Sequence, residues 1–185
     1  MRAKYASESN PIKRQRLKEQ HNRIIEVLKE EGGSEFQLVD RNGRELYSCE
    51  MPASVSKDEM VGWAMSEAIA SDTKLTNGNF KNKKLRSFNL KGGDFRGSAF
   101  NGTVFEHVKF DGSDLSRCNF SNAKLIGCSF KNCNLKDAIF LETENSDCNF
   151  TGSNLSGTEF IDSDFSSSYG LAIKTLTLIK NSKME

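Results

Sequence analysis

Large apolar side chains recur at every fifth residue through the second half of the chain. From Leu75 to Phe165, the nineteen positions that are multiples of five hold Leu or Phe in eighteen cases, and Asn145 is the exception. A helix repeats its buried face about every 3.6 residues and a strand about every 2, so neither element alone places all these side chains in one core. The period of five therefore predicts a chain that turns once per unit.

Each quintet is organised around its Leu or Phe, which we call the centre. The position two before the centre favours small side chains, such as Ser98 and Ala138, and the position two after it is Gly, Asn or Asp in fourteen of nineteen quintets. Those three residue types tolerate the positive φ of a tight corner. Because one quintet cannot bury its own apolar face, the units are expected to stack as a solenoid. A period of twenty residues is supported by the ladder of Phe80, Phe100, Phe120, Phe140 and Phe160.

The quintets SDLSR, CNFSN, AKLIG, CSFKN, CNLKD, CNFTG and SNLSG resemble the pentapeptide-repeat family, and the resemblance covers residues 73–167. It implies a right-handed, four-sided β-helix. We therefore expect a mainly β protein: a solenoid of about five coils, a small α/β module at residues 1–72, and a C-terminal cap or tail at residues 168–185. At about 4.8 Å between stacked strands, the rod would be roughly 20 to 25 Å long.

Two residues depart from the pattern. Asn145 is the centre of LETEN, where a buried amide would need hydrogen-bond partners, so a bulged or flipped corner is expected, with a binding feature as the alternative. Phe88 replaces a small residue, and we expect the wider first coil to accommodate it.

The cysteines follow the repeat. Four of the five occupy the small position two before a centre, where a thiol packs as a compact apolar group: Cys118, Cys128, Cys133 and Cys148. A zinc site would favour paired C-x2-C spacings instead. Cys49 has no obvious companion, so neither a disulfide nor a metal is expected, and a reducing compartment is favoured.

The N-terminal module is predicted to contain a helix, a hairpin and a second helix. Residues 11–31 carry apolar side chains at helical spacing and are followed by two glycines, and two apolar runs then flank an Asn-Gly turn in EFQLVDRNGRELYSCEM. Ser56 and Glu59 have the spacing of a capping box ahead of the second helix. The module is expected to cover the open N-terminal end of the solenoid, and the sequence leaves open whether it also recognises a partner.

The tail, SYGLAIKTLTLIKNSKME, is more apolar than the sequence before it, which predicts a cap or a dimer contact at the C-terminal end. Ile139, Leu141 and Ile161 flank inward-pointing phenylalanines at positions where the family usually has polar residues. We expect these three side chains to form an apolar patch beneath the tail or against a second chain.

Charge is nearly balanced, with 26 basic and 25 acidic residues. This balance removes the simplest electrostatic argument for a nucleic-acid or anionic-membrane partner. The distribution is polarised, however, with acidic residues near the end of the repeats and basic ones near the start. A candidate partner-binding surface is formed by the basic residues Lys81, Lys83, Lys84 and Arg86.

Catalytic chemistry is not indicated. His21 and His107 lie far apart, and GGDFRGS lacks the lysine of a phosphate-binding loop. No catalytic, cofactor-binding or metal residues are predicted, and the protein is expected not to be an enzyme. No run approaches the roughly 18 apolar residues of a membrane span, and the start lacks a signal-peptide core. A cytoplasmic location is expected, in the host cell if this is a secreted effector or a phage protein.

These observations favour a protein-interaction scaffold of a bacterium or a phage. The partner is expected to be a protein, nucleic acid is disfavoured, and a homodimer through the C-terminal end stays open. The family suggests two alternatives: a DNA mimic that modulates DNA gyrase, and a secreted bacterial effector. A DNA mimic would need an acidic rod, yet residues 73–167 hold twelve basic and eleven acidic side chains.

Overall fold

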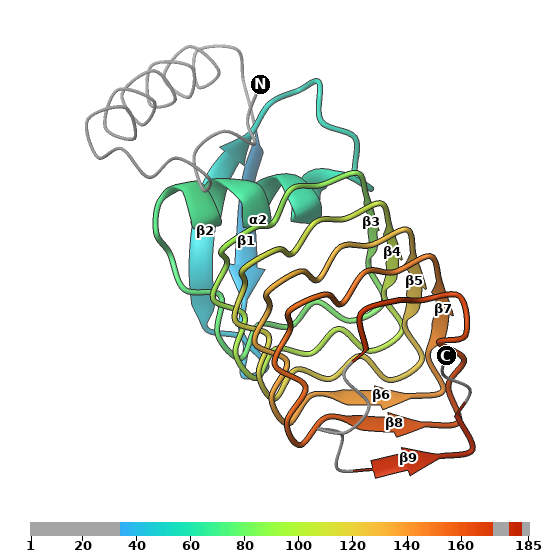
Figure 1. Cartoon of the computed structure of the whole chain (residues 1–185). Coiled ribbons are helices and arrows are strands. Elements are labelled where there is room, and N and C mark those ends of the chain that lie inside the picture. Colours follow the sequence, from blue (N-terminus) through green and yellow to red (C-terminus); the bar gives the residue numbers. More distant parts are fainter. Residues whose placement is uncertain (1–33, 172–177, 183–185) are drawn as a thin grey trace.

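The computed structural model describes residues 34–171 and 178–182, so the helix predicted at residues 11–31 lies outside the described part. An antiparallel pair of strands is followed by a helix and then by short parallel strands that wind into a rod (Figure 1). The elements are β1 (Ser34–Val39), β2 (Glu45–Met51), α2 (Met60–Ala70), β3 (Lys84–Arg86), β4 (Val104–Glu106), β5 (Lys124–Ile126), β6 (Ile139–Leu141), β7 (Glu144–Ser146), β8 (Glu159–Ile161) and β9 (Leu178–Lys180). The fold is mainly β, as predicted.

Residues twenty apart lie side by side in successive turns of the rod. One side is the parallel sheet β3-β4-β5-β7, in which Phe105 is in register with Leu85, and a second side is the sheet β6-β8-β9. The other two sides are columns of isolated parallel bridges, such as Asn134 with Asn154. Leu75 and Leu155, eighty residues apart, bound four complete turns, and the chain continues into a fifth. The predicted four-sided β-solenoid is therefore confirmed.

The centres of the quintets form the core of the rod. All eighteen Leu and Phe centres are buried. Rings in neighbouring turns stack: the centroids of Phe120 and Phe100 are 5.1 Å apart, and those of Phe120 and Phe140 are 4.9 Å apart. Phe120 also meets Phe130 edge to face at 6.1 Å. Such aromatic pairs stabilise the core beyond the area they bury.

The corners have the backbone conformation that the sequence predicts. Every position two after a centre, from Asn77 to Asp162, has a positive φ, between 48° and 75°. Most of these residues are Gly, Asn or Asp, but His107 and Arg117 adopt the same conformation. The requirement comes from the solenoid path, because each turn must change direction four times.

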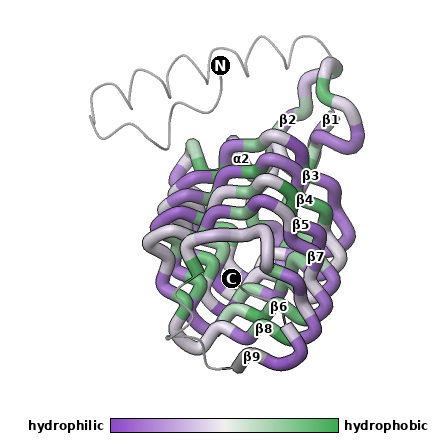
Figure 2. The backbone as a smooth tube through the Cα atoms, turned by 45° about the vertical axis from the view of Figure 1, so that its right-hand side comes forward, coloured by the Kyte–Doolittle hydropathy of each residue, from purple (hydrophilic) through white to green (hydrophobic). Residues whose placement is uncertain are grey.

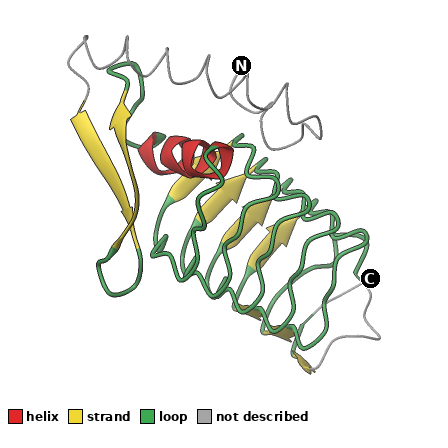
Figure 3. Cartoon of the chain, turned by 90° about the vertical axis from the view of Figure 1, so that its left-hand side faces the viewer, coloured by secondary structure: helices red, strands yellow, loops and turns green. Residues whose placement is uncertain are grey.

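The hairpin and α2 cover the N-terminal end of the rod (Figure 3). The backbone N–H of Asn79 donates to the carbonyl of Val39 at 2.9 Å, so the end of β1 pairs with the edge of the first turn. A Cβ atom on Gly62 of α2 would lie 2.2 Å from the ring of Phe88. Phe88 can thus replace a small residue because its neighbour on one side is the helix rather than another turn.

The start of α2 differs from the prediction. Ser56 is not the residue that caps the helix, since α2 begins at Met60 with Glu59 at the N-cap position and no side-chain capping hydrogen bond. The Glu59 carboxylate instead accepts from the Ser56 hydroxyl at 2.6 Å and from the Ser56 backbone N–H at 3.2 Å. The two residues therefore close the turn that leads into the helix.

Asn145 causes no bulge, which corrects the expectation from sequence. It lies in β7, in parallel register with Leu125. Its Nδ2 donates to the carbonyl of Thr143 at 3.3 Å, while its Oδ1 is buried without a hydrogen-bond partner. The regular pairing of the backbone on both sides maintains the register, and burial of the unpaired Oδ1 atom lowers the stability of the fold.

The described part of the tail continues the solenoid. β9 pairs in parallel with β8, with Ile179 in register with Phe160, and the backbone N–H of Asp162 donates to the carbonyl of Lys180 at 2.9 Å. β9 thereby adds a strand to the edge of the sheet. It does not lie over the sheet's outward face.

Candidate partner-binding surfaces

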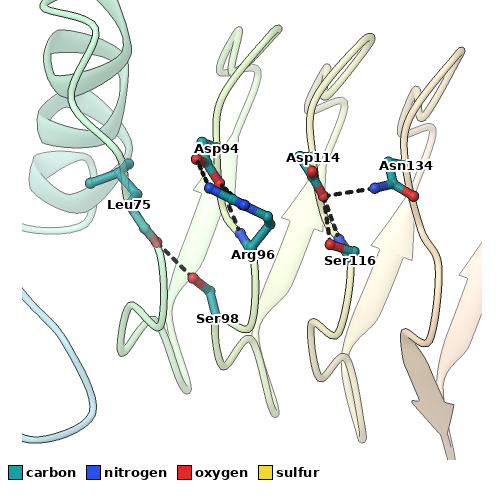
Figure 4. A network of polar contacts seen from close by, with 7 residues as sticks. All are labelled: Leu75, Asp94, Arg96, Ser98, Asp114, Ser116 and Asn134. Atoms are coloured by element: carbon teal, nitrogen blue, oxygen red, sulfur yellow. Dashed lines mark hydrogen bonds and ion pairs between the residues drawn. The ribbon is translucent and has the colours of Figure 1, made fainter.

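The four cysteines of the repeat are hydrogen-bond donors in the core. Their thiols donate to the carbonyl of the centre 23 residues earlier, as Cys133 does to Phe110 at 3.1 Å. Ser and Thr make the same contact at equivalent positions, as Ser98 does to Leu75 at 2.7 Å (Figure 4). Sequence reasoning predicted burial of these cysteines but missed the shared donor role, which the alternation of Cys, Ser and Thr at one position could have indicated.

All described cysteines are free. Burial raises the pKa of Cys118, and it raises the pKa of Cys133 from its ordinary value of 9.0 to about 12. Within the described residues, no three His, Cys, Asp or Glu side chains lie close enough to hold a metal ion. His107 is exposed at a corner, and His21 lies outside the described residues. These thiols therefore fit a structural role.

Two of the predicted basic residues line a groove between the N-terminal module and the first turn. The groove has a volume of about 340 Å³, and we call it the module groove; its lining is Asp58, Glu59, Lys84, Arg86, Ser87 and Phe88. Arg86 forms an ion pair with Glu106 at 2.5 Å. Lys81 and Lys83 are exposed and do not line this groove. The two acidic residues from the loop before α2 were not foreseen, because only the packing of α2 brings that loop to β3.

A second, larger groove of about 560 Å³ follows one side of the rod. We call it the polar trough; its lining is Thr76, Asn77, Arg96, Gly97, Asp114, Ser116, Arg117, Asn134, Lys136 and Asp137. Figure 4 shows that its side chains bind one another: Asp114 accepts from Ser116 Oγ at 2.7 Å and from Asn134 Nδ2 at 3.1 Å. Arg96 binds Asp94 with both ends of its guanidinium at 2.8 Å, which lowers the pKa of that carboxyl. Many of its charges are thus engaged within the chain.

Ion pairs also connect neighbouring turns. Four of them join residues twenty apart: Arg86 with Glu106, Lys91 with Asp111, Arg117 with Asp137, and Lys124 with Glu144. Each is at least partly exposed, so each contributes roughly 0 to 1 kcal/mol. Their larger effect is on the surface, where they place a basic group beside an acidic one along the rod.

The structure brings together the three predicted apolar residues. Leu141 in β6 is in register with Ile161 in β8, and Ile139 lies at the other end of β6. All three are half-buried and on the outward face of the sheet, where Figure 2 shows hydrophobic positions on both strands. Nothing in the described tail covers them. Tyr169, which was not among the predicted residues, is the most exposed large hydrophobic residue in the described part of the chain, at 57%.

The geometry defines the class of protein: a β-solenoid of twenty-residue turns with a capped N-terminal end. The family model of pentapeptide repeats matches in eight copies, at residues 84–117, 113–144 and 146–169. Residues 84–169 of the rod are therefore pentapeptide repeats, and the match covers slightly less than half of the chain. No curated protein sequence is significantly similar to it, and within the described residues no helix has the length and apolar character needed to cross a membrane.

Several solved structures are similar to this chain at low sequence identity and with TM-scores below 0.5. Rfr23, a pentapeptide repeat protein from the cyanobacterium Cyanothece 51142, is 21% identical with a TM-score of 0.44, and the alignment covers 56% of this chain and 65% of that one. A pentapeptide repeat protein of the Arabidopsis thaliana thylakoid lumen is 20% identical over 55% of this chain and 70% of that one, with a TM-score of 0.37. QnrB1, a plasmid-mediated fluoroquinolone resistance protein, is 19% identical over 62% and 68%, with a TM-score of 0.37. The chain thus spans slightly less than two thirds of Rfr23.

Proposed function

We propose that this protein is a non-enzymatic scaffold of a bacterium or a phage, and that it binds a protein partner through the module groove. The observation that carries the proposal is the composition of this groove. It combines Lys84 and Arg86 from the rod with Asp58 and Glu59 from the module, and the half-buried Phe88 lies beside them. Charges of both signs around an aromatic residue suit a protein surface better than a single anion or cation.

The position of the groove supports the same proposal. Repeated faces present similar rows of polar side chains in every turn, whereas the groove is bounded on one side by a segment that occurs once. A partner that contacts both sides can be selected by shape as well as by charge. The module then has two roles, because it covers the edge of the first turn and supplies half of the binding surface.

The charge pattern disfavours the alternative of DNA mimicry. A mimic needs acidic side chains whose charge is not cancelled nearby, but Glu106, Asp111, Asp137 and Glu144 each lie beside a basic residue of the preceding turn. Neutral pairs produce little of the field that a duplex produces. The secreted-effector alternative concerns where such a scaffold acts, and translocation into host cells is its direct test.

The test compares three full-length proteins in capture from a bacterial lysate: the wild type, the groove variant Lys84→Glu with Arg86→Glu, and the control variant Lys131→Glu with Lys136→Glu. Both variants change the charge equally, and Lys131 and Lys136 are exposed and lie outside the module groove. A protein captured by the wild type and the control, but lost with the groove variant, supports the proposal. Equal capture by all three contradicts the site, and strong inhibition of DNA gyrase by the wild type would favour mimicry instead.

A further inference from the structure

One long edge of the rod has opposite charges at its two ends. It is the edge where the sheet β6-β8-β9 meets the sheet β3-β4-β5-β7 (Figure 1). In the first turn it carries Lys81, Lys83 and Lys84, and all three are exposed. In the fourth and fifth turns, three or four turns further along, it carries the exposed acidic residues Glu142, Glu144 and Asp162. We call these six residues and the turns between them the charged edge.

Most of these charges are uncompensated within the described chain. Lys81, Lys83, Lys84 and Glu142 form no ion pair with any described residue. Glu144 contacts Lys124 at 3.0 Å but remains 75% exposed, and Asp162 accepts a hydrogen bond from Asn181. The edge thus presents a basic end and an acidic end, about 15 to 20 Å apart at about 4.8 Å for each turn.

From this arrangement we propose that two copies of the protein associate side by side and antiparallel along the charged edge. A two-fold axis perpendicular to the rod, between Gly102 in the second turn and Asn122 in the third, places the basic end of each copy against the acidic end of the other. In the column of Lys84 the match is direct, because the register of the sheets places Glu144 in that same column. Lys84 then faces Glu144, and Lys83 lies next to the column of Glu142 and Asp162.

The apolar patch fits the same arrangement. Lys81 lies in the column of Leu141 and Ile161, which are half-buried and outward-facing. Across the two-fold axis, the aliphatic stem of Lys81 in one copy meets these two side chains in the other. A parallel arrangement would instead bring like charges together, so electrostatics select the antiparallel one. An interface of this type is isologous and closes at two copies.

The contact is small, since an edge of about five turns at about 4.8 Å is only about 24 Å long. An area below the standard interface of about 800 Å² for each partner predicts weak binding that depends on salt. This distinguishes the charged edge from a dimer through the apolar C-terminal end, which salt would not weaken in the same way.

The experiment measures self-association of the full-length protein by sedimentation velocity, at about 10 to 500 µM protein and at about 50 and 500 mM salt. One variant is Lys81→Glu with Lys83→Glu, and the other is Glu142→Lys with Glu144→Lys. The matched control is Lys131→Glu with Lys136→Glu, and thermal melting verifies that each protein is folded. None of the four substituted edge residues lines the module groove, so loss of this interface and loss of the groove can be told apart.

We expect wild-type and control dimers that are at least about tenfold weaker at the higher salt. Each edge variant alone should be monomeric, because its edge carries charges of mainly one sign. An equimolar mixture of the two edge variants should form a one-to-one dimer, because the opposite signs are restored between chains. A monomeric wild type at low salt, edge variants that associate like the wild type, or a mixture that stays monomeric would each overturn the proposal.

Discussion

The amide of Asn145 shows how strongly the backbone of the solenoid determines the position of a side chain. Leu125 and Asn145 are in register in neighbouring strands, although one side chain suits the core and the other does not. The buried Oδ1 atom has no hydrogen-bond partner. A carbonyl oxygen removed from water in this way costs roughly 1 to 3 kcal/mol.

Replacing Asn145 by Leu should therefore raise the free energy of unfolding by about 1 to 3 kcal/mol, because the substitution restores an apolar centre. Chemical denaturation of the two proteins measures the difference. Asn145→Asp serves as the comparison, since it keeps the shape and should destabilise the fold. A destabilised Asn145→Leu variant would show that the amide makes a stabilising contact that the structure does not contain.

The corner residue Arg117 is a second position at which the local conformation lowers the stability of the fold. It has a φ of 57° and is neither Gly, Asn nor Asp. Arg117→Asn should stabilise the protein by about 0.5 to 1 kcal/mol, since Asn tolerates this conformation better. The lost contact with Asp137 spans 4.0 Å and contributes little. Lys136→Asn, one residue before the corner at Asp137 in the next turn, should leave the melting temperature nearly unchanged. Equal shifts for the two variants would contradict a cost at the corner.

At the scale of the elements, the strands of the rod are only three residues long and are stabilised by the columns of side chains that cross them. Phe120 stacks between Phe100 and Phe140 and is fully buried. The other columns likewise consist of buried Leu and Phe centres, apart from Asn145, so a single truncation leaves a cavity between two turns.

Phe120→Ala should lower the free energy of unfolding by about 3 to 5 kcal/mol through lost burial and the cavity that remains. Lys131→Ala, at an exposed position in the same turn, should change it by less than about 0.5 kcal/mol. Urea denaturation distinguishes the two. Comparable losses would mean that the assignment of centres to the core is wrong.

The buried thiol of Cys133 predicts a dependence of stability on pH. The unfolded chain releases the Cys133 proton near pH 9, whereas the folded chain retains it up to about pH 12. The stability that this difference provides is complete below pH 9 and declines as the pH rises from 9 to 12, by up to about 1.4 kcal/mol for each pH unit. Cys133→Ser keeps the hydrogen bond to Phe110 and removes this titration. The variant should lose less stability than the wild type as the pH rises from about 8 to about 10. Identical dependences of stability on pH would contradict the raised pKa of Cys133.

The sequence predicts elements better than contacts between distant segments. The period of five determined the centres, corners and turns, because each position repeats the same environment many times. The hairpin around Asn42-Gly43 also followed from local signals. The start of α2 did not, since Glu59 binds Ser56 while the helix begins one residue later. The module groove could not be predicted either, because it depends on the packing of Gly62 against Phe88, which no local pattern encodes.

At the scale of the whole molecule, the two ends of the rod are covered by different elements. The N-terminal end has a hairpin that pairs with the first turn and a helix that packs over it. The described part of the C-terminal end has one added strand, β9, at the edge of a sheet. Edges of this kind are sites of further association.

Deleting residues 178–185 should therefore expose β8 as a new edge and promote aggregation. Light scattering during storage at about 37 °C measures this, with the full chain as reference. The substitution Ser182→Ala, which removes the contact to the Ser163 backbone N–H but keeps β9, should have a much smaller effect. A truncated protein that is as soluble and as stable as the full chain would show that β9 does not protect the edge.

The register between turns also determines how the length of such a protein can vary. Contacts between turns join residues close to twenty apart, so removing or adding one block of twenty residues leaves each remaining column aligned. A block whose length is not a multiple of five would shift corners into the core, and a block of five, ten or fifteen residues would change which columns align. Viable natural variants should therefore differ in length by whole turns, and each gained or lost turn would change the distance between the basic and acidic ends by about 4.8 Å. In a two-fold pair both copies have the same length, so a change in length preserves pairing between identical chains. It would prevent pairing with a relative of another length, because the basic and acidic ends of the two chains would then lie at different distances.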